Sequence, residues 1–444
     1  MLLDHLFTTE PMRAIFSDVR RLQGMLDFEA ALARAETRVG MIPPTVAETI
    51  AARCRADRFD LEALARATAK AGNPAIPLIA ALTEQVASDD AEAARYVHWG
   101  ATSQDAMDTG LVLQLRAALA ALDADLTRLA RACAKLAASS AGTPIAGRTW
   151  LQQASPTTFG LKVAGWLSAI NRHRQRLRQL RPRVLVIQLG GSVGTLAGFG
   201  ALGLEVAASL ADDLGLALPD IPWHSNRDRV AEVATTMGLL ASTLGKMARD
   251  TSLLAQTEVG EAFEPDEPGK GGSSTLPQKR NPVGASVALA AATRIPGLVA
   301  TMLAAMPQEH ERGLGGWQAE WETLPEIICL TAGALAQMAQ VVEGIELDSD
   351  RMRANLDLTR GVVCAEAVAL ALVPSVGKSQ ARALIGEASR RALAQRLSLR
   401  EALAAIPEVT AHLSSDKLDH LCDPAHVVGP AGRLIQRVLA QEIE

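Results

Sequence analysis

The sequence predicts an all-α protein built around a bundle of long helices. Aromatic residues are scarce, with 7 Phe, 6 Trp and 1 Tyr among 444 residues, and strand-rich proteins depend on such side chains. The chain is filled instead with Ala, Leu, Arg and Glu, residues that favour helices. Five long stretches also carry apolar residues at helical spacing, which indicates a central five-helix bundle.

The predicted helices fall into three parts, as the length of the chain suggests. Residues 1–104 form a smaller N-terminal helical domain with a break at Pro43 and another at Gly72. Residues 105–347 form the central bundle and supply the active-site loops and the oligomer contacts. Residues 348–444 form a C-terminal helical domain that Pro374 and Pro407 interrupt.

The central part carries the five long runs. Its first helix is supported by Leu residues at positions 111, 113, 115, 119, 122, 126 and 129. We expect these helices at 105–138, from Pro156 to about Arg181 with its end at Pro182, and at 229–259, 283–305 and 318–342. Helices so apolar on more than one face need neighbours from other subunits, which predicts an obligate homo-oligomer.

Two segments between the helices are irregular. Residues 184–189 are the one run typical of a strand, and glycines follow at 190–194. The Gly-x-Gly-x-x-Gly spacing of a dinucleotide site is absent there, so we interpret these glycines as a turn after a helix. The Gly- and Pro-containing segment 264–274 is the best candidate for a mobile loop.

Composition and charge exclude several classes of protein. Lys and Arg number 44 and Asp and Glu 49, so the net charge of −5 gives no general attraction to nucleic acid or anionic membrane. Five scattered cysteines without a Cys-x-x-Cys pair favour free thiols in a reducing compartment and no zinc cluster. We find no signal peptide and no apolar run of about 20 residues, and therefore expect a cytoplasmic protein.

Polar residues gather in three loops that precede long helices. The first is His98-Trp-Gly-Ala-Thr-Ser-Gln-Asp105. Its Thr102, Ser103 and Gln104 can cap the next helix or bind an anion at the positive helix end, and capping alone is the simpler interpretation. The second loop is Gly147-Arg-Thr-Trp-Leu-Gln-Gln-Ala-Ser-Pro156, in which Arg148 and Gln152 are suited to bind a carboxylate.

The third loop is Gly271-Gly-Ser-Ser-Thr-Leu-Pro-Gln-Lys-Arg-Asn-Pro282. Its glycines leave backbone amides exposed, its serines add hydroxyls, and Lys279 and Arg280 add positive charge. This density of donors suits a polyanionic substrate and a developing oxyanion. The alternative is a flexible basic loop, which does not require this order of residues.

The third loop closely resembles the signature of the fumarase/aspartase superfamily, and the other two loops match its remaining signatures in the same order. This resemblance covers nearly the whole chain. It implies an all-helical homotetramer whose sites each combine loops from three subunits. It also implies reaction across a carbon–carbon bond beside a carboxylate, without a cofactor or a metal.

Within the superfamily, the chain resembles the branch of bacterial 3-carboxy-cis,cis-muconate cycloisomerases. The features shared with that branch are Gly72-Asn-Pro-Ala-Ile-Pro77, Leu276, the segment Glu311 to Trp321, and Trp150 where lyases carry a histidine as general acid. Indole cannot donate a proton at neutral pH, so the lyase assignment does not transfer to Trp150. The branch implies an intramolecular lyase, an isomerase that lactonises a tricarboxylate to 4-carboxymuconolactone in protocatechuate/β-ketoadipate catabolism.

The resemblance also implies roles for individual residues. Ser273 handles the proton on the carbon α to a carboxylate, while Lys279 and Asn281 stabilise the resulting aci-carboxylate. Arg312 and Arg227 could clamp the remaining carboxylates, although a structural ion pair of Arg227 with Asp228 or Glu232 is equally consistent. We expect further substrate contacts from His98, His224 and Trp150, and surface positions for the histidines at 5, 173, 412, 420 and 426.

Two other functions are alternatives to this interpretation of the sequence. An adenylosuccinate-lyase-like enzyme, or another β-elimination lyase, would share the same three loops. A non-enzymatic helical scaffold would not explain them.

Overall fold

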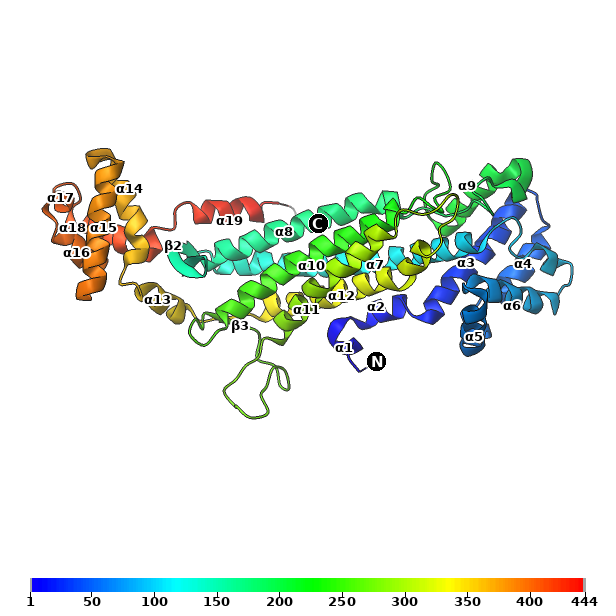
Figure 1. The fold of residues 1–444 in the computed structure, drawn as a ribbon, viewed down its shortest axis with the longest axis horizontal. Helices are drawn as coiled ribbons and strands as arrows, with labels where there is room; N and C mark the ends of the chain where they lie inside the picture. The colour runs from blue at the N-terminus through cyan, green and yellow to red at the C-terminus, as the bar shows by residue number, and fades with distance from the viewer. Residues whose placement is uncertain (1, 442–444) are drawn as a thin grey trace. The chain divides into compact units, whose positions relative to one another are not determined.

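A computed structural model describes residues 2–441, and its regular structure is almost entirely helical, as the sequence predicts (Figure 1). The helical elements are α1 (Asp4–Phe7), α2 (Glu10–Ile15), α3 (Asp18–Arg38), α4 (Pro44–Arg53), η1 (Ala56–Arg58), α5 (Leu61–Ala71), α6 (Ala75–Ala87), η2 (Ala93–Tyr96), α7 (Ser103–Ser139), α8 (Phe159–Val184), η3 (Ala197–Leu202), α9 (Gly203–Leu214), α10 (Asp228–Leu254), α11 (Val283–Ala304), α12 (Gly316–Gly344), α13 (Ser349–Asp357), η4 (Val362–Cys364), α14 (Ala365–Val376), α15 (Lys378–Gln395), α16 (Leu399–Ala404), α17 (Pro407–Thr410), α18 (Ser415–Cys422), η5 (Pro424–His426) and α19 (Ala431–Leu439). The strands are β1 (Pro144–Thr149), β2 (Gln152–Thr158), β3 (Ala262–Phe263) and β4 (Glu346–Leu347).

The five long helices of the sequence prediction are confirmed as α7, α8, α10, α11 and α12. Helix α7 buries its leucines at positions 115, 119, 122, 126 and 129 completely, whereas Leu111 and Leu113 are partly buried. The largest differences from the predicted boundaries concern α8 and α10. Helix α8 continues past Pro182 to Val184, and α10 ends at Leu254 instead of near residue 259.

The chain divides into two compact units. The first holds Met1–Asp125, His173–Ser242 and Ala290–Ala336, and the second holds Leu126–Arg172, Thr243–Leu289 and Gln337–Glu444. Each of the five long helices therefore contributes one part to each unit. The division into 1–104, 105–347 and 348–444 stays a prediction.

The first unit packs its N-terminal helices on α3. Helix α3 contacts α4 and α9, and it buries a continuous face that includes Leu26, Phe28 and Leu32. Helix α5 packs mainly on α6 and has no buried residue of its own. The loops that lead into α7 and α10 also belong to this unit.

The second unit contains a β-hairpin that the sequence prediction missed. Strands β1 and β2 pair antiparallel and are joined by Trp150 and Leu151, which both have positive φ angles, 52° and 65°. The expected strand at 184–189 is wrong, because Val186 forms only an isolated bridge with Ala217. Gln, Ser and Pro residues give the hairpin little strand character, which explains why its sequence did not reveal it.

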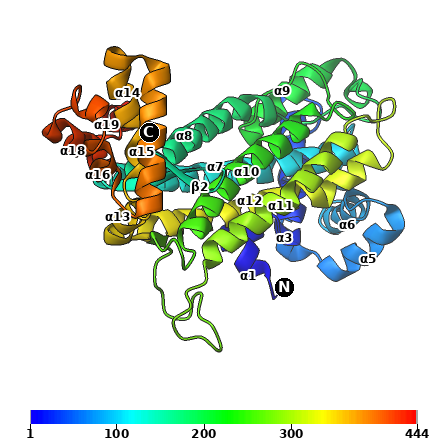
Figure 2. The same cartoon turned by 60° about the vertical axis from the view of Figure 1, so that its left-hand side comes forward.

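The C-terminal helices of the second unit have their own core. Helices α14 and α15 lie side by side, and α16 and α18 pack against them (Figure 2). Buried Val368, Leu384, Ala388, Leu403 and Leu418 belong to this core.

Three smaller expectations meet the structure as follows. All five cysteines are free, with three buried and two partly buried, as expected. His173 is 3% exposed, so its predicted surface position is wrong. Among the described residues, α11 and α12 are long and apolar enough to span a membrane, which the sequence analysis did not expect of any segment. Core helices of soluble proteins meet the same criterion.

Candidate functional site

The loop before α7 is held in place by the buried carboxylate of Asp105. This carboxylate accepts hydrogen bonds from the backbone amides of Gly190 at 3.0 Å and Gly191 at 2.9 Å. It also accepts one from the amide of Thr102 at 3.0 Å, which caps the start of the helix. Gly191 has a φ of +70°, and a Cβ atom there would lie 2.9 Å from the oxygen of Gly100. The glycines therefore form a turn, as predicted, and the turn binds Asp105.

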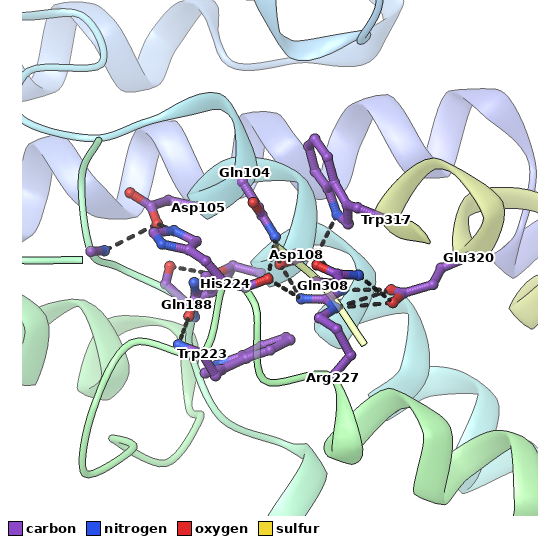
Figure 3. Close-up of polar contacts among 12 residues, drawn as sticks. Gln104, Asp105, Asp108, Gln188, Trp223, His224, Arg227, Gln308, Trp317 and Glu320 are labelled. Carbon is purple, nitrogen blue, oxygen red and sulfur yellow. Dashed lines mark hydrogen bonds and ion pairs between the residues drawn. The ribbon is translucent and has the colours of Figure 1, made fainter. Parts of the chain in front are cut away.

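His224 is the fourth partner of Asp105 (Figure 3). Its Nε2 lies 2.7 Å from Asp105 Oδ1, and the histidine is 3% exposed. Gln104, fully buried, donates from Nε2 to the backbone oxygen of His224 at 2.9 Å. Both side chains thus stabilise the loop from inside, and their expected contacts with substrate stay predictions.

Arg227 lies at the centre of a buried ion triad. Its terminal nitrogens bind Asp108 at 2.7 and 3.0 Å, and one of them binds Glu320 at 2.7 Å (Figure 3). All three residues are at most 2% exposed. The expectation that Arg227 forms a structural ion pair is therefore confirmed, but the expected partners Asp228 and Glu232 are wrong. With its fork occupied by two carboxylates, Arg227 is not placed to clamp a substrate.

Neighbouring side chains complete the hydrogen bonds of the triad. Trp317 donates from Nε1 to Asp108 at 3.2 Å, and Gln308 donates to Glu320 at 3.3 Å. The guanidinium of Arg227 lies 4.9 Å from the centroid of the Trp223 ring. Burial raises the pKa of Glu320 and Arg227 opposes that rise. The triad is therefore a rigid, water-excluded anchor for the start of α10.

A cavity of about 380 Å³ borders this triad, between α3, α5, α7 and α12. Most of its lining is apolar and includes Met25, Leu64, Met107, Trp317 and Trp321. Its acidic side chains, at positions 18, 108, 320 and 322, outnumber its two arginines, at 21 and 227. The cavity therefore disfavours an anionic ligand.

Arg312 is an arginine of the first unit that remains available for an anion. It donates to the Thr102 hydroxyl and to the Ser192 carbonyl, both at 2.9 Å, and the described residues give it no carboxylate partner. Ser103 lies beside Thr102 at the first turn of α7, where Asn73 Nδ2 reaches its hydroxyl at 3.5 Å. We call Thr102, Ser103 and Arg312 the anion site. It combines a free positive charge, two hydroxyls and a helix N-terminus.

His98 begins the same loop in a left-handed backbone conformation, with a φ of 59°. Its Nδ1 lies 2.6 Å from the buried carboxylate of Glu29 on α3. Burial lowers the pKa of His98, but the charges of Glu29 and Asp105 outweigh burial and the net shift is upward. The imidazole therefore favours its charged form more than an ordinary histidine does.

The hairpin of the second unit holds Arg148 in an ion pair within the chain, and its expected contact with a substrate carboxylate stays a prediction. Its terminal nitrogens bind the two oxygens of buried Glu261 at 2.7 and 2.8 Å. Asn355 donates to the same carboxylate at 2.8 Å. The charge of Arg148 is therefore balanced within the chain. Trp150 and Gln152, by contrast, are exposed at the hairpin tip and at the start of β2.

The third loop runs without regular structure from Glu264 to Pro282, between β3 and α11 (Figure 1). Ser273 Oγ accepts hydrogen bonds from the amides of Thr275 at 3.3 Å and Leu276 at 3.1 Å. The described residues give exposed Lys279 no ion-pair partner. Arg280, in contrast, binds both oxygens of Glu346 at 3.0 Å.

Asn281 closes the base of this loop. Its backbone amide donates to the oxygen of Gly271 at 2.8 Å, and its side-chain Nδ2 donates to the oxygen of Gly272 at 3.4 Å. Gly271 has a φ of +70°, and a Cβ atom there would lie 2.5 Å from the oxygen of Asn281. The spacing of these residues in the sequence thus reflects a loop geometry that holds Ser273 and Lys279 on one short segment.

The structure therefore groups most of the predicted residues in three sets, one of which is formed by the hairpin residues Arg148, Trp150 and Gln152. Thr102, Ser103, Gln104, His224 and Arg312 gather at the start of α7, whereas Ser273, Lys279 and Asn281 share one loop of the second unit. Sequence reasoning missed the carboxylates at 29, 108, 261 and 320, and it quoted Asn73 in a motif without assigning it a contact. Glu320 lies in the quoted segment Glu311 to Trp321, and Asp108 follows the first loop by three residues. These positions were the only indication in the sequence that the two carboxylates belong to the site.

Comparisons with known proteins define the class. A family model described as Lyase matches residues 6–297, and one described as Adenylosuccinate lyase C-terminus matches residues 361–438. The chain belongs to the lyase family, within the fumarase/aspartase superfamily.

Within this family, the similarity to cycloisomerases spans the whole chain. This chain is 60% identical to the 3-carboxy-cis,cis-muconate cycloisomerase of Pseudomonas aeruginosa, over 99% of this chain and 96% of that protein. The crystal structure of 3-carboxy-cis,cis-muconate lactonizing enzyme from Pseudomonas putida matches with a TM-score of 0.94 and 55% identity, over 99% of this chain and 98% of that one. The nitrosuccinate lyase of Streptomyces davaonensis is 44% identical, over 97% of this chain and 92% of that protein.

Proposed function

We propose that this chain is an enzyme that lactonises 3-carboxy-cis,cis-muconate to 4-carboxymuconolactone in cytoplasmic aromatic catabolism. The observation that carries the proposal is Trp150 at the tip of the β1–β2 hairpin. Lyases of the superfamily place a histidine at this point of the motif, and an indole cannot protonate a leaving group. Lactonisation has no leaving group to protonate, because the nucleophile is a carboxylate of the substrate itself.

The substrate with three ionised carboxylates takes up one proton as it isomerises; Ser273 delivers this proton and regains one from water, and no other co-reactant is needed. A carboxylate oxygen forms a C–O bond to one alkene carbon, while the neighbouring carbon gains a proton. That neighbouring carbon is α to a second carboxylate, which holds extra negative charge as an aci-carboxylate in the intermediate. An enzyme for this reaction must bind three carboxylates and stabilise one added charge.

Ser273 carries the α-proton in this proposal. A serine hydroxyl is a poor acid or base, so its alkoxide needs stabilisation. The amides of Thr275 and Leu276, which donate to Ser273 Oγ, supply that stabilisation in the observed loop conformation. Lys279 and Asn281, on the same loop, stabilise the aci-carboxylate.

The remaining carboxylates bind at the anion site. Arg312 has a charge that no carboxylate of the described chain neutralises, and Thr102 and Ser103 add hydroxyl donors. His98 adds a further donor. Arg148 acts through Glu261 as a support of the hairpin, while Gln152 is exposed and available to the substrate.

We further propose that four copies assemble and that each active site combines loops of three of them. Trp150 is 96% exposed and Leu151 is 80% exposed, on a turn whose positive φ angles are unfavourable for both residues. In the most apolar stretch of α11, only 28% of the residues are buried within one chain. Contacts between copies would remove both surfaces from water.

The test is the loss of absorbance of 3-carboxy-cis,cis-muconate when purified protein is added. Fumarate, adenylosuccinate and argininosuccinate serve as parallel substrates. Turnover of the muconate alone supports the proposal. Turnover of adenylosuccinate or fumarate instead would favour a β-elimination lyase, and no turnover of any substrate would favour a non-enzymatic scaffold.

A further inference from the structure

Helix α3 carries two buried carboxyl groups that the reaction described above does not use. Glu29 is 2% exposed and Glu36 is 0% exposed, and they lie seven residues apart, about two turns along the same helix face. Neither oxygen of Glu36 has a hydrogen-bond partner among the described residues, and Glu29 has one bonded oxygen only. That single partner is His98.

The two carboxyl groups cannot both be charged without a large penalty, because an unpaired charge in an apolar interior is strongly disfavoured. Burial, assisted by the nearby Glu29, raises the pKa of Glu36 to about 9. Glu36 is therefore a neutral acid at neutral pH. We assign the negative charge to Glu29, since only Glu29 has a donor, and its partner His98 supplies the compensating positive charge.

The geometry of the pair fixes the orientation of the imidazole. Nδ1 of His98 faces Glu29 at 2.6 Å, so Nε2, at the opposite edge of the ring, faces away from α3. No described residue forms a hydrogen bond with Nε2. The loop backbone is fixed as well, because His98 keeps its left-handed conformation and a Cβ on Gly100 would lie 2.7 Å from the Phe199 ring.

We propose that Glu29 is a positioning residue that holds His98 as an imidazolium, so that Nε2–H binds a substrate carboxylate beside the anion site. This inference rests on the proposed function and deepens it. The His98 imidazolium and the Arg312 guanidinium would then be two cations of the same unit. A ligand with three carboxylates needs more than one cationic partner. Glu36 then serves as an uncharged neighbour that leaves Glu29 free to pair with His98.

Other charged groups around the pair are consistent with this arrangement. Asp105 on α7 also favours the imidazolium, and it is itself bound by His224. Cys54, directly after α4, lies near Glu29, and burial raises the pKa of its thiol, so it stays neutral. Arg34, near Cys54, is bound by Asp213.

Titration of His98 tests the pair without reference to activity. The full-length protein is labelled with [¹³Cε1]-histidine, and the His98 signal is assigned from its absence in His98→Asn. We expect the wild-type signal to titrate above the ordinary value of about 6.5, and to move downward by about one unit or more in Glu29→Gln. Glu36→Gln is the matched control, since a neutral amide replaces a neutral acid, and it should leave the titration in place.

Kinetics then test the positioning role. At pH 8, where an unpaired histidine is neutral, Glu29→Gln should raise KM by about tenfold or more, with a smaller change in kcat. At pH 5.5 the loss in the same variant should be smaller, because a larger fraction of His98 is protonated without help from Glu29. Glu29→Asp should restore part of the loss at pH 8, and Glu36→Gln should stay within about twofold of the wild type at both pH values.

An unchanged His98 titration in Glu29→Gln would overturn the proposal, as would an equal loss in Glu36→Gln. A Glu29→Gln loss that is the same at both pH values would point to simple misfolding and would also overturn it. If wild type does not lactonise the muconate, the proposed function fails. The titration then still decides whether Glu29 holds His98 in its charged form.

Discussion

Replacing Arg227 with methionine tests whether this arginine anchors the fold or binds substrate. Methionine keeps most of the buried apolar length and removes the guanidinium. Asp108 and Glu320, each 2% exposed, would then lose their common cation and leave two like charges in a water-excluded site. Breaking a buried pair by removing one partner destabilises proteins by about 3–5 kcal/mol, so we expect a loss of that size in the free energy of unfolding.

The loss should depend on pH with a defined sign. Burial already raises the pKa of Glu320, and removing Arg227 removes the charge that opposes this rise. A carboxyl group whose pKa is higher in the folded state than in the unfolded state stabilises least at high pH. The deficit of Arg227→Met relative to wild type should therefore grow as the pH rises above about 4.3, the ordinary glutamate value.

Urea unfolding at pH 5 and pH 8, followed by far-ultraviolet circular dichroism, measures both effects. Arg183→Met is the matched control, because Arg183 pairs with Glu232 at an exposed site and its loss should leave the midpoint unchanged. The triple variant Arg227→Met, Asp108→Leu, Glu320→Leu should recover much of the stability. A stable Arg227→Met protein with a strongly raised KM would refute the reasoning, since that result identifies a substrate clamp.

Three further predictions follow from single contacts. Arg312→Met should raise KM for the tricarboxylate about 10- to 100-fold, the value of one or two charge-assisted hydrogen bonds, and an unchanged KM would exclude Arg312 from the anion site. Gly191→Ala should lower stability by about 1–3 kcal/mol in thermal unfolding, because its φ is +70° and its amide holds Asp105, whereas a wild-type melting profile would show that the turn tolerates a side chain. Trp150→His should not create fumarase-type activity, because carboxylate-binding positions differ as well, and rapid turnover of fumarate, adenylosuccinate or argininosuccinate by this variant would contradict that expectation.

The sequence was sufficient for the long helices and for the three loops. Apolar periodicity over 30 or so residues is a strong signal, and the boundaries of α7 and α11 differ from the prediction by at most two residues. The third loop was recognisable because its glycines, serines and Lys279 stand in a fixed order. These features are local in the chain, so local patterns can report them.

The partners of the charged residues could not be predicted in the same way. Arg227 binds Asp108 and Glu320, which lie 119 and 93 positions away in the chain. His98 binds Glu29, 69 positions away. Such pairs depend on how helices pack, and a buried glutamate on α3 looks in sequence like any residue of a solvated face. For the same reason the sequence does not reveal that Arg148 pairs with Glu261, 113 positions away.

The most direct test of the central claim compares Ser273→Ala with Ser274→Ala. The two serines are adjacent, but the amides of Thr275 and Leu276 donate to Ser273 Oγ alone. Loss of 3-carboxy-cis,cis-muconate absorbance should proceed in the wild type and in Ser274→Ala, and should be abolished in Ser273→Ala while the assembly keeps its wild-type size in sedimentation. Near-normal turnover by Ser273→Ala would contradict the account.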